Sequence, residues 1–252
     1  MSQVWLYSLV SVIIVSLISI AGVLTFLLSP KKLRSLLLYL VSFSVGGLFG
    51  DALIHLIPEA MKEAGGFELN MSLCILFGLI SSFIMEKFLQ WRHCHIPTST
   101  EHPHPFAYMN LFGDALHNFI DGLLIAGSYL ATGSLQVGIA TTLAVIFHEI
   151  PQEIGDFGVL VYGGFSRSKA LLFNFLSAIT AIIGALVFLS LSPYIREYTI
   201  YLLPFAAGEF IYIAGSDLVP ELHKETNPSK STLQLIALIF GLVVIFLLVF
   251  FE

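Results

Sequence analysis

The chain has 252 residues, of which 57% are hydrophobic and 11% are charged, and its mean hydropathy is +0.90. An average soluble domain is roughly 25% charged, and a soluble fold of this length has no core large enough to bury so much apolar surface. With 11 Lys+Arg against 17 Asp+Glu, the composition also excludes a nucleic-acid-binding protein and a disordered chain. It indicates a polytopic membrane protein whose surroundings are the lipid bilayer.

Apolar runs long enough to cross a bilayer recur eight times along the chain. A transmembrane helix needs about 20 predominantly apolar residues. The predicted spans are residues 4–28, 36–57, 69–90, 107–130, 134–161, 168–191, 198–221 and 231–251. We therefore expect an all-α membrane protein with eight transmembrane helices, in a single transmembrane domain that covers residues 1–252.

The basic residues predict which side of the membrane each loop faces, because cytoplasmic loops carry an excess of Lys and Arg. Nine of the eleven basic residues lie in or beside the loops that follow the first, third, fifth and seventh spans. The opposite side has only Lys62 and Arg196. This asymmetry predicts an even number of spans and places both termini outside the cytoplasm. It also makes residues 91–106 a cytoplasmic loop between the third and fourth spans.

Two stretches of the chain resemble each other at a constant separation. Residues 43–46 (FSVG) and 56–59 (LIPE) in the second span recur as residues 205–208 (FAAG) and 218–221 (LVPE) in the seventh, an offset of 162 in both cases. Three spans on either side of a two-span middle give an inverted 3+2+3 organisation, because the second unit enters the membrane from the opposite side. Inverted repeats of this kind are common in secondary transporters.

Four of the predicted spans contain ionisable residues that hydrocarbon should reject. Each charged residue at the centre of a bilayer costs at least about 2.5 kcal/mol, so these side chains must face one another, water or a bound cation. The polar residues are Asp51 and His55 in the second span, Asp114, His117, Asn118 and Asp121 in the fourth, His148, Glu149, Gln152, Glu153 and Asp156 in the fifth, and Glu209 and Asp217 in the seventh.

The spacing of these residues predicts a metal site. In the fourth span they recur at i, i+3, i+4 and i+7, and therefore share one helix face; those of the fifth span do the same. A histidine with a carboxylate or amide four residues later places two ligands one turn apart. Two such helices face to face supply imidazole, carboxylate and amide groups, which suit zinc and its first-row neighbours.

Proline and glycine in these two spans affect the same face. Pro151 lacks an N–H, so the carbonyl of Phe147 has no helical donor. We therefore expect Pro151 to break or kink the fifth helix there. Small residues at Gly122, Gly127 and Gly155 allow neighbouring helices to approach closely.

At these residues the sequence resembles the ZIP (Zrt-, Irt-like) family of divalent-metal transporters. Residues 117–122 (HNFIDG) resemble the family's fourth-span motif HNFxDG, and residues 148–153 (HEIPQE) resemble the fifth-span motif HEXPHE of its LIV-1-type branch. The resemblance extends over the whole chain. It implies a homodimeric transporter that carries divalent metal, with zinc as the first candidate, into the cytoplasm and that has no cofactor of its own.

The resemblance also implies a binuclear site between the fourth and fifth spans. One metal ion would be bound by His117, Asp121, His148 and position 152. The second would be bound by Asn118, Asp121, Glu149 and an oxygen of position 152 or of Glu153, so that Asp121 bridges the two. This sequence has Gln152 where the branch usually has histidine. An amide oxygen is a harder and weaker ligand than imidazole, so Fe(2+), Mn(2+) or Cd(2+) are alternative cargoes.

Other polar residues have two interpretations each. Asp51 and His55 either line the ion pathway or form a hydrogen bond between helices, and Asp114 either guides the ion or pairs with a neighbour. Glu209 and Asp217 belong either to the pathway or to helix packing. The loop histidines either capture metal or belong to a flexible polar loop. These histidines are His93, His95, His102 and His104.

A metalloprotease and a passive channel are the alternatives to a carrier. A metalloprotease would use the HExxH motif, but position 152 is Gln and Pro151 is expected to break the helix that this motif needs. A passive metal channel has the same sequence features as a carrier. The absence of a large extracellular domain favours the inner membrane of a prokaryote.

Overall fold

The structure is a computed structural model that describes residues 2–20, 29–93, 103–132, 135–195 and 201–249. Its elements are α1 (Ser2–Ile18), α2 (Pro30–Gly50), η2 (Asp51–Leu56), α3 (Ile57–Ala64), α4 (Leu69–His93), α5 (Pro105–Thr132), α6 (Leu135–Tyr162), α7 (Arg167–Ala178), α8 (Thr180–Ile195), α9 (Leu202–Tyr212), η4 (Ile213–Leu218), α10 (Val219–Leu222) and α11 (Pro228–Leu248). Here η marks a π-helical turn. The described part of the chain contains no strand.

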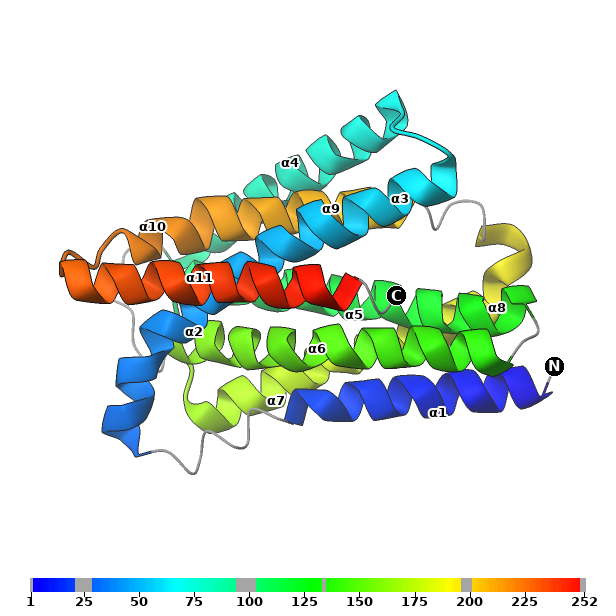
Figure 1. Ribbon diagram of the computed structural model, residues 1–252, viewed down its shortest axis with the longest axis horizontal. Coiled ribbons are helices and arrows are strands. Elements are labelled where there is room, and N and C mark those ends of the chain that lie inside the picture. Colours follow the sequence, from blue (N-terminus) through cyan, green and yellow to red (C-terminus); the bar gives the residue numbers. More distant parts are fainter. Residues whose placement is uncertain (1, 21–28, 94–102, 133–134, 196–200, 250–252) are drawn as a thin grey trace.

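The helices form a bundle with α5 and α6 near its middle. They run roughly along the long axis of the molecule, with α4 on one side of this pair and α1 on the other (Figure 1). The main packing partners are α2 with α11, α4 with α9, and α5 with α8. In the same view α1 begins, α5 ends, α6 begins and α11 ends toward the right, so the first and last helices have their free ends on one side of the bundle.

Each predicted span corresponds to a helix or to a run of helices. Five described stretches are long and apolar enough to cross a membrane: Leu36–Lys62, Leu69–Phe88, Arg167–Ser192, Leu202–Leu222 and Pro228–Leu248. The described part of α1 is 17 residues long, and α5 and α6 have 28 residues each but carry the polar faces. The prediction of an all-α membrane protein is confirmed.

The interior of three spans differs from the regular helix that hydropathy predicts. The second and seventh spans each change from α- to π-helical hydrogen bonding in their middle, over η2 and η4. The sixth is divided at Ile179 into α7 and α8. There the hydroxyl of Thr180 lies within hydrogen-bond distance of two carbonyls, that of Ala115 in α5 at 2.5 Å and that of Ser177 in α7 at 2.6 Å.

The expectation that Pro151 breaks the fifth span is wrong. Residues 135–162 form one helix with Pro151 inside it. A long helix that is packed on several sides tolerates one missing backbone hydrogen bond, because tertiary contacts hold the flanking turns in place. The broken helix therefore no longer counts against a metalloprotease, and only the missing second histidine of HExxH does.

The internal repeat is visible in the backbone. In η2 the N–H of Ile57 donates to the carbonyl of Ala52, and in η4 the N–H of Val219 donates to the carbonyl of Ala214. Both the donors and the acceptors are 162 residues apart, the offset of the sequence repeat. The two π-turns are therefore equivalent features of the two halves.

The helix contacts of the two halves match as well. A Cβ atom added to Gly241 of α11 would lie 2.3 Å from the carbonyl oxygen of Phe43 in α2, and one added to Gly78 of α4 would lie 2.0 Å from that of Phe205 in α9. The ring of Phe43 lies 5.8 Å from that of Phe240, and the ring of Phe205 lies 5.5 Å from that of Phe77. The pair α2–α11 thus corresponds to the pair α9–α4, which supports the inverted 3+2+3 organisation.

α8 packs closely on α5 at the level of the polar residues. A Cβ atom added to Gly122 would lie 1.9 Å from the carbonyl oxygen of Ala181, so only glycine fits. Gly155 of α6 faces Ser44 of α2, and Gly127 of α5 faces Phe188 of α8, both at contact distance. The three glycines therefore allow close approach of helices, as predicted.

Candidate metal site

The polar faces of α5 and α6 are buried in the centre of the bundle, with no more than 2% of any of these residues exposed. The buried residues are Asp114, His117, Asn118 and Asp121 on α5, and Glu149, Glu153 and Asp156 on α6. The two helices contact each other along this face. The four α5 residues and three of the five α6 residues that periodicity placed on one face are therefore buried between the helices.

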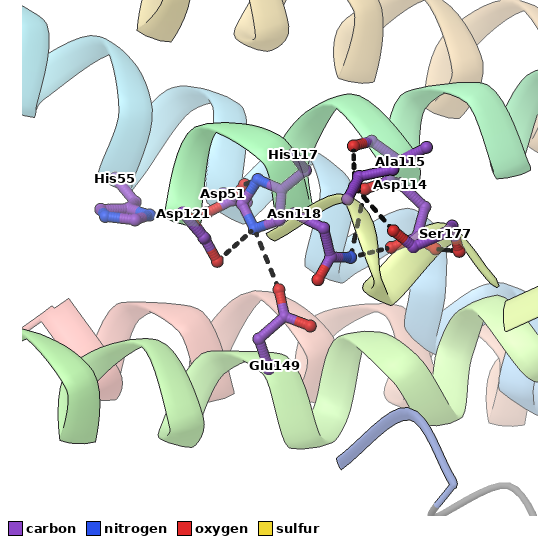
Figure 2. Close-up of polar contacts among 10 residues, drawn as sticks. Asp51, His55, Asp114, Ala115, His117, Asn118, Asp121, Glu149 and Ser177 are labelled. Atoms are coloured by element: carbon purple, nitrogen blue, oxygen red, sulfur yellow. Dashed lines mark hydrogen bonds and ion pairs between the residues drawn. The ribbon is translucent and has the colours of Figure 1, made fainter. Parts of the chain in front are cut away.

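Three of these side chains form a compact cluster. Nε2 of His117 lies 3.6 Å from Oδ2 of Asp121 and 3.5 Å from Oε1 of Glu149 (Figure 2). One ligand atom from each of the three residues lies within 4.8 Å of the others. Two ligands of a tetrahedral zinc ion are about 3.3 Å apart, given bonds of about 2.0–2.1 Å. The cluster is therefore close to the size that such an ion needs.

The second span contributes to the same place. Oδ2 of Asp51 lies 3.5 Å from Nδ1 of His117, and Oδ1 of Asp51 lies 2.7 Å from Nδ1 of His55. The hydrogen bond of Asp51 with His55 is made within η2 and not between helices. Asp51 thus faces the cluster, with His55 beside it.

Asp114 pairs with its neighbours, one of the two roles left open above. It accepts a hydrogen bond from Nδ2 of Asn118 at 2.9 Å and another from the hydroxyl of Ser177. The side-chain oxygen of Asn118 has no hydrogen-bond partner in the part of the chain that the structure describes. That oxygen is therefore available to a ligand.

The C-terminal part of the polar face of α6 is hydrogen-bonded to α5 and α7. Glu153 accepts a hydrogen bond from Nδ2 of Asn174 in α7, and Asp156 accepts one at 3.0 Å from Nδ2 of Asn110 in α5. Asn110, Asn174 and Ser177 are not among the site residues predicted from the sequence. Asn110 lies one turn before Asp114 and continues its face, which was a usable signal. The two α7 residues carried no signal beyond being polar in an apolar span.

Two predicted ligands of α6 are less defined. The side chain of His148 lies outside what the structure describes, although its position in α6 is given. Gln152 is half-buried and lines a small pocket with residues of α2 and α11, among them Ser44 and Ile245. Its Nε2 atom has no hydrogen-bond partner among the described residues.

Glu209 and Asp217 lie apart from the cluster. Glu209 is buried in α9 and both its carboxylate oxygens lack hydrogen-bond partners among the described residues. Asp217 is buried in η4, close enough to Glu86 and Glu221 for mutual repulsion. Glu86, which the sequence argument missed, accepts a hydrogen bond from the hydroxyl of Tyr212 at 2.5 Å.

Of the loop histidines, only His104 has a described side chain. Its backbone N–H donates to the carbonyl of Gly163 at 2.7 Å, which joins the start of α5 to the end of α6. Partial burial lowers the pKa of His104 below its ordinary value, while Glu221 acts in the opposite direction. His95 and His102 lie outside the described residues, as does the side chain of His93.

A bundle of membrane-spanning helices with a buried histidine–carboxylate cluster defines an integral membrane protein that handles cations. The chain matches the family described as ZIP Zinc transporter over residues 2–106 and 95–249. It is similar to Zinc transporter ZIP13 of Pongo abelii, with 31% identity over 266 residues that cover 96% of this chain and 78% of the relative. It is also similar to Zinc transporter ZIP13 of Danio rerio, with 32% identity over 312 residues, 98% of this chain and 87% of the relative.

A third relative is Zinc transporter SLC39A7 of Mus musculus, with 28% identity over 310 residues that cover 89% of this chain and 64% of the relative. The chain belongs to the ZIP zinc transporter family. The resemblance stated from two motifs is thereby confirmed. Members of this family are transporters, so the metalloprotease alternative is set aside.

Proposed function

We propose that this protein transports zinc across a membrane through the buried face between α5 and α6. The observation that carries the proposal is the cluster of His117, Asp121 and Glu149, with ligand atoms within 4.8 Å of one another. A buried imidazole next to two carboxylates replaces the water shell of a divalent ion at the middle of the membrane. The names of the relatives support zinc as the cargo.

The site is proposed to hold two ions. The first uses His117, Asp121, His148 and Gln152. The second ion uses Asn118, Asp121, Glu149 and an oxygen of Gln152 or Glu153. The side-chain oxygen of Asn118 has no hydrogen-bond partner among the described residues, which supports the proposal of a second ion. Asn174 occupies only Oε2 of Glu153, and its Oε1 has no hydrogen-bond partner among the described residues, so both Glu153 and Gln152 stay candidates for the remaining oxygen.

The cargo range is set by the ligand at position 152. An amide oxygen holds zinc less tightly than imidazole, and it suits harder ions better. Fe(2+) and Mn(2+) are therefore proposed as further cargoes. Cd(2+), a softer ion, is proposed as another because weaker zinc binding lowers the selectivity for zinc. A weak ligand also favours release, which a transporter needs as much as binding.

The polar residues outside the cluster are proposed to guide the ion to and from it. These pathway residues are Asp51, His55, Asp114, Asp156, Glu209 and Asp217. His104 and the other histidines of residues 91–106 would then capture metal that leaves the pathway on the cytoplasmic side. Transport into the cytoplasm proceeds by alternating access, in which one group of helices moves against the other.

The orientation and assembly follow from charge and family. Both termini lie outside the cytoplasm, in keeping with the excess of basic residues in the loops on the opposite side. The protein acts as a homodimer in the inner membrane of a prokaryotic cell, and residues 1–252 form a single transporter domain.

The test is metal flux into liposomes that contain purified protein and a zinc-sensitive dye. His117→Ala, Asp121→Ala and Glu149→Gln are expected to lower zinc flux at least about tenfold, since even residues that merely support a metal ligand change affinity by that much. The matched controls are His223→Ala and Glu68→Gln, which remove an exposed histidine and an exposed carboxylate. Wild-type flux in all three site variants rules out this site. Flux at diffusion rates without saturation indicates a channel and not a carrier.

A further inference from the structure

His117 is contacted on its two nitrogens by different parts of the fold. Its Nε2 atom faces Asp121 of the same helix and Glu149 of α6 at 3.6 and 3.5 Å. Its Nδ1 atom faces Asp51 of η2 at 3.5 Å. The imidazole ring therefore lies between the proposed metal site and a carboxylate that comes from the second span (Figure 2).

A neutral imidazole carries one N–H, and a metal binds only the nitrogen that lacks it. A carboxylate behind the other nitrogen accepts that N–H and leaves the metal-facing nitrogen free. Histidine ligands of metals commonly have such a partner, which sets the tautomer and the ring orientation and makes the ligand more basic. Asp51 stands in that place relative to His117, on the side away from Asp121 and Glu149.

We propose that Asp51 is a positioning residue, which accepts Nδ1–H of His117 and so presents Nε2 to the metal. This inference rests on the proposed function of the α5–α6 site. It adds a role behind the metal ligand to the proposed place of Asp51 in the ion pathway. The distance of 3.5 Å is long for a hydrogen bond, and bonds of this kind often tighten only when the ligand is bound.

A π-turn begins at Asp51. The wide turn Asp51–Leu56 inserts a residue into the helix, and such turns are frequent at functional sites. Within it, Nδ1 of His55 donates to Oδ1 of Asp51 at 2.7 Å, because an ionised carboxylate only accepts. His55 therefore holds one oxygen of Asp51 and leaves the other for His117. On this basis His55 acts as an anchor for the positioning carboxylate.

The arrangement ties the metal ligand on α5 to the second span. η2 contacts α9 and is continuous with α2, which packs on α11 and α6, whereas His117 belongs to α5, which packs on α8 and α6. A movement of α5 relative to the second span would change the Asp51–His117 contact. Metal affinity would then depend on the relative position of these two spans, which is what uptake on one side and release on the other require.

The first experiment measures zinc affinity by competition with a chelating dye, using purified full-length protein in detergent. Asp51→Ala is expected to weaken zinc binding by about 10- to 100-fold. Asp51→Asn keeps an oxygen that accepts the N–H, so its loss of zinc affinity is expected to be smaller than that of Asp51→Ala. His55→Ala is expected to fall between wild type and Asp51→Ala. Ser42→Ala is the control, because it removes a hydroxyl from α2 that bonds only to Leu38 of its own helix.

The second experiment reports the tautomer directly. Nitrogen-15 NMR of protein with labelled histidine, assigned with His117→Gln, is expected to show the proton of His117 on Nδ1 in metal-free wild type and in Asp51→Asn. A structural role for Asp51 would leave this tautomer unchanged in Asp51→Ala, whereas the proposal requires a mixture. If Asp51→Ala does not fold, the spectra of Asp51→Asn and His55→Ala still test the proposal. The His117 proton should stay on Nδ1 in Asp51→Asn, and its preference for Nδ1 should be weaker in His55→Ala.

Two results would overturn the proposal. One is zinc affinity of Asp51→Ala within about twofold of wild type, far short of the loss expected for a group that supports a ligand. The other is equal loss in Asp51→Asn and Asp51→Ala, which makes Asp51 a direct metal ligand. The zinc affinity of His117→Ala separates these results from failure of the site itself. Unchanged affinity in His117→Ala rules out the site. Reduced affinity in His117→Ala with unchanged affinity in Asp51→Ala rules out only the positioning role.

Discussion

Asn118 donates a hydrogen bond from Nδ2 to Oδ1 of Asp114 at 2.9 Å, one turn back along α5. This bond determines which end of the amide points where, because the nitrogen is held by the carboxylate and the oxygen is left toward the α5–α6 face. Asp114 is itself held by the hydroxyl of Ser177 in α7. A residue outside the proposed ligand set thus orients one that belongs to it.

Replacement of Asp114 by alanine is expected to release the amide of Asn118 and to weaken the second metal site. Because the first site keeps His117 and Asp121, zinc binding should remain while its stoichiometry or the affinity of the weaker ion falls by about tenfold. Isothermal titration of purified protein measures both quantities. Ser177→Ala, which removes one of the two donors to Asp114, is expected to have a smaller effect. Identical titration curves for Asp114→Ala and wild type would contradict this role.

Replacement of Gln152 by histidine is expected to tighten zinc binding and to slow zinc release. Imidazole is a stronger ligand than an amide oxygen for zinc, and the gain should be smaller for Mn(2+), which favours oxygen. The measurement compares affinity and single-turnover release for zinc and manganese in wild type and Gln152→His. Asn70→His, an exposed position at the start of α4, controls for the added imidazole. Equal affinities for both metals in Gln152→His and wild type would remove position 152 from the ligand set.

The two polar faces were predictable because helix periodicity determines which residues lie together on one side. The spacing of His117 and Asp121 and the buried position of Glu149 were enough to place the cluster between two helices. The repeat was predictable from residues 43–46 and 205–208, whose equivalent helices make equivalent contacts. In each case the pattern is local or is a direct comparison of two segments.

The partners of each side chain were not predictable in the same way. Regular periodicity does not indicate the π-turn at Asp51–Leu56, and the extra residue in that turn rotates all later positions by about one residue's angle, about 100°. Similarly, Glu153 shares the α6 face but is held by Asn174, a residue on a third helix whose position depends on packing.

The close contact of α5 with α8 predicts strong sensitivity at Gly122. Alanine there would bring Cβ to 1.9 Å from the carbonyl oxygen of Ala181, a backbone atom that has no room to move. Helix propensity favours alanine over glycine by about 1 kcal/mol, whereas overpacking costs about 1–3 kcal/mol or more. Steric overlap with backbone should win, so Gly122→Ala is expected to lower the thermal midpoint in detergent. The control is Gly47→Ala, whose Cβ would meet nothing within 4 Å and which should be neutral or stabilising.

The last prediction concerns the pH response of His104, which lies just before α5. Its pKa is lowered by partial burial and by Lys224 and raised by Glu221, with burial as the largest effect. A histidine with a lowered folded pKa binds fewer protons than in the unfolded chain, so its contribution to stability is present above the ordinary value of 6.5 and is lost as the pH falls below it. Nitrogen-15 NMR titration should give a midpoint below 6.5 for His104. Glu221→Gln is expected to lower this midpoint further and Lys224→Gln to raise it, and a midpoint at or above the ordinary value in wild type would contradict the burial of this side chain.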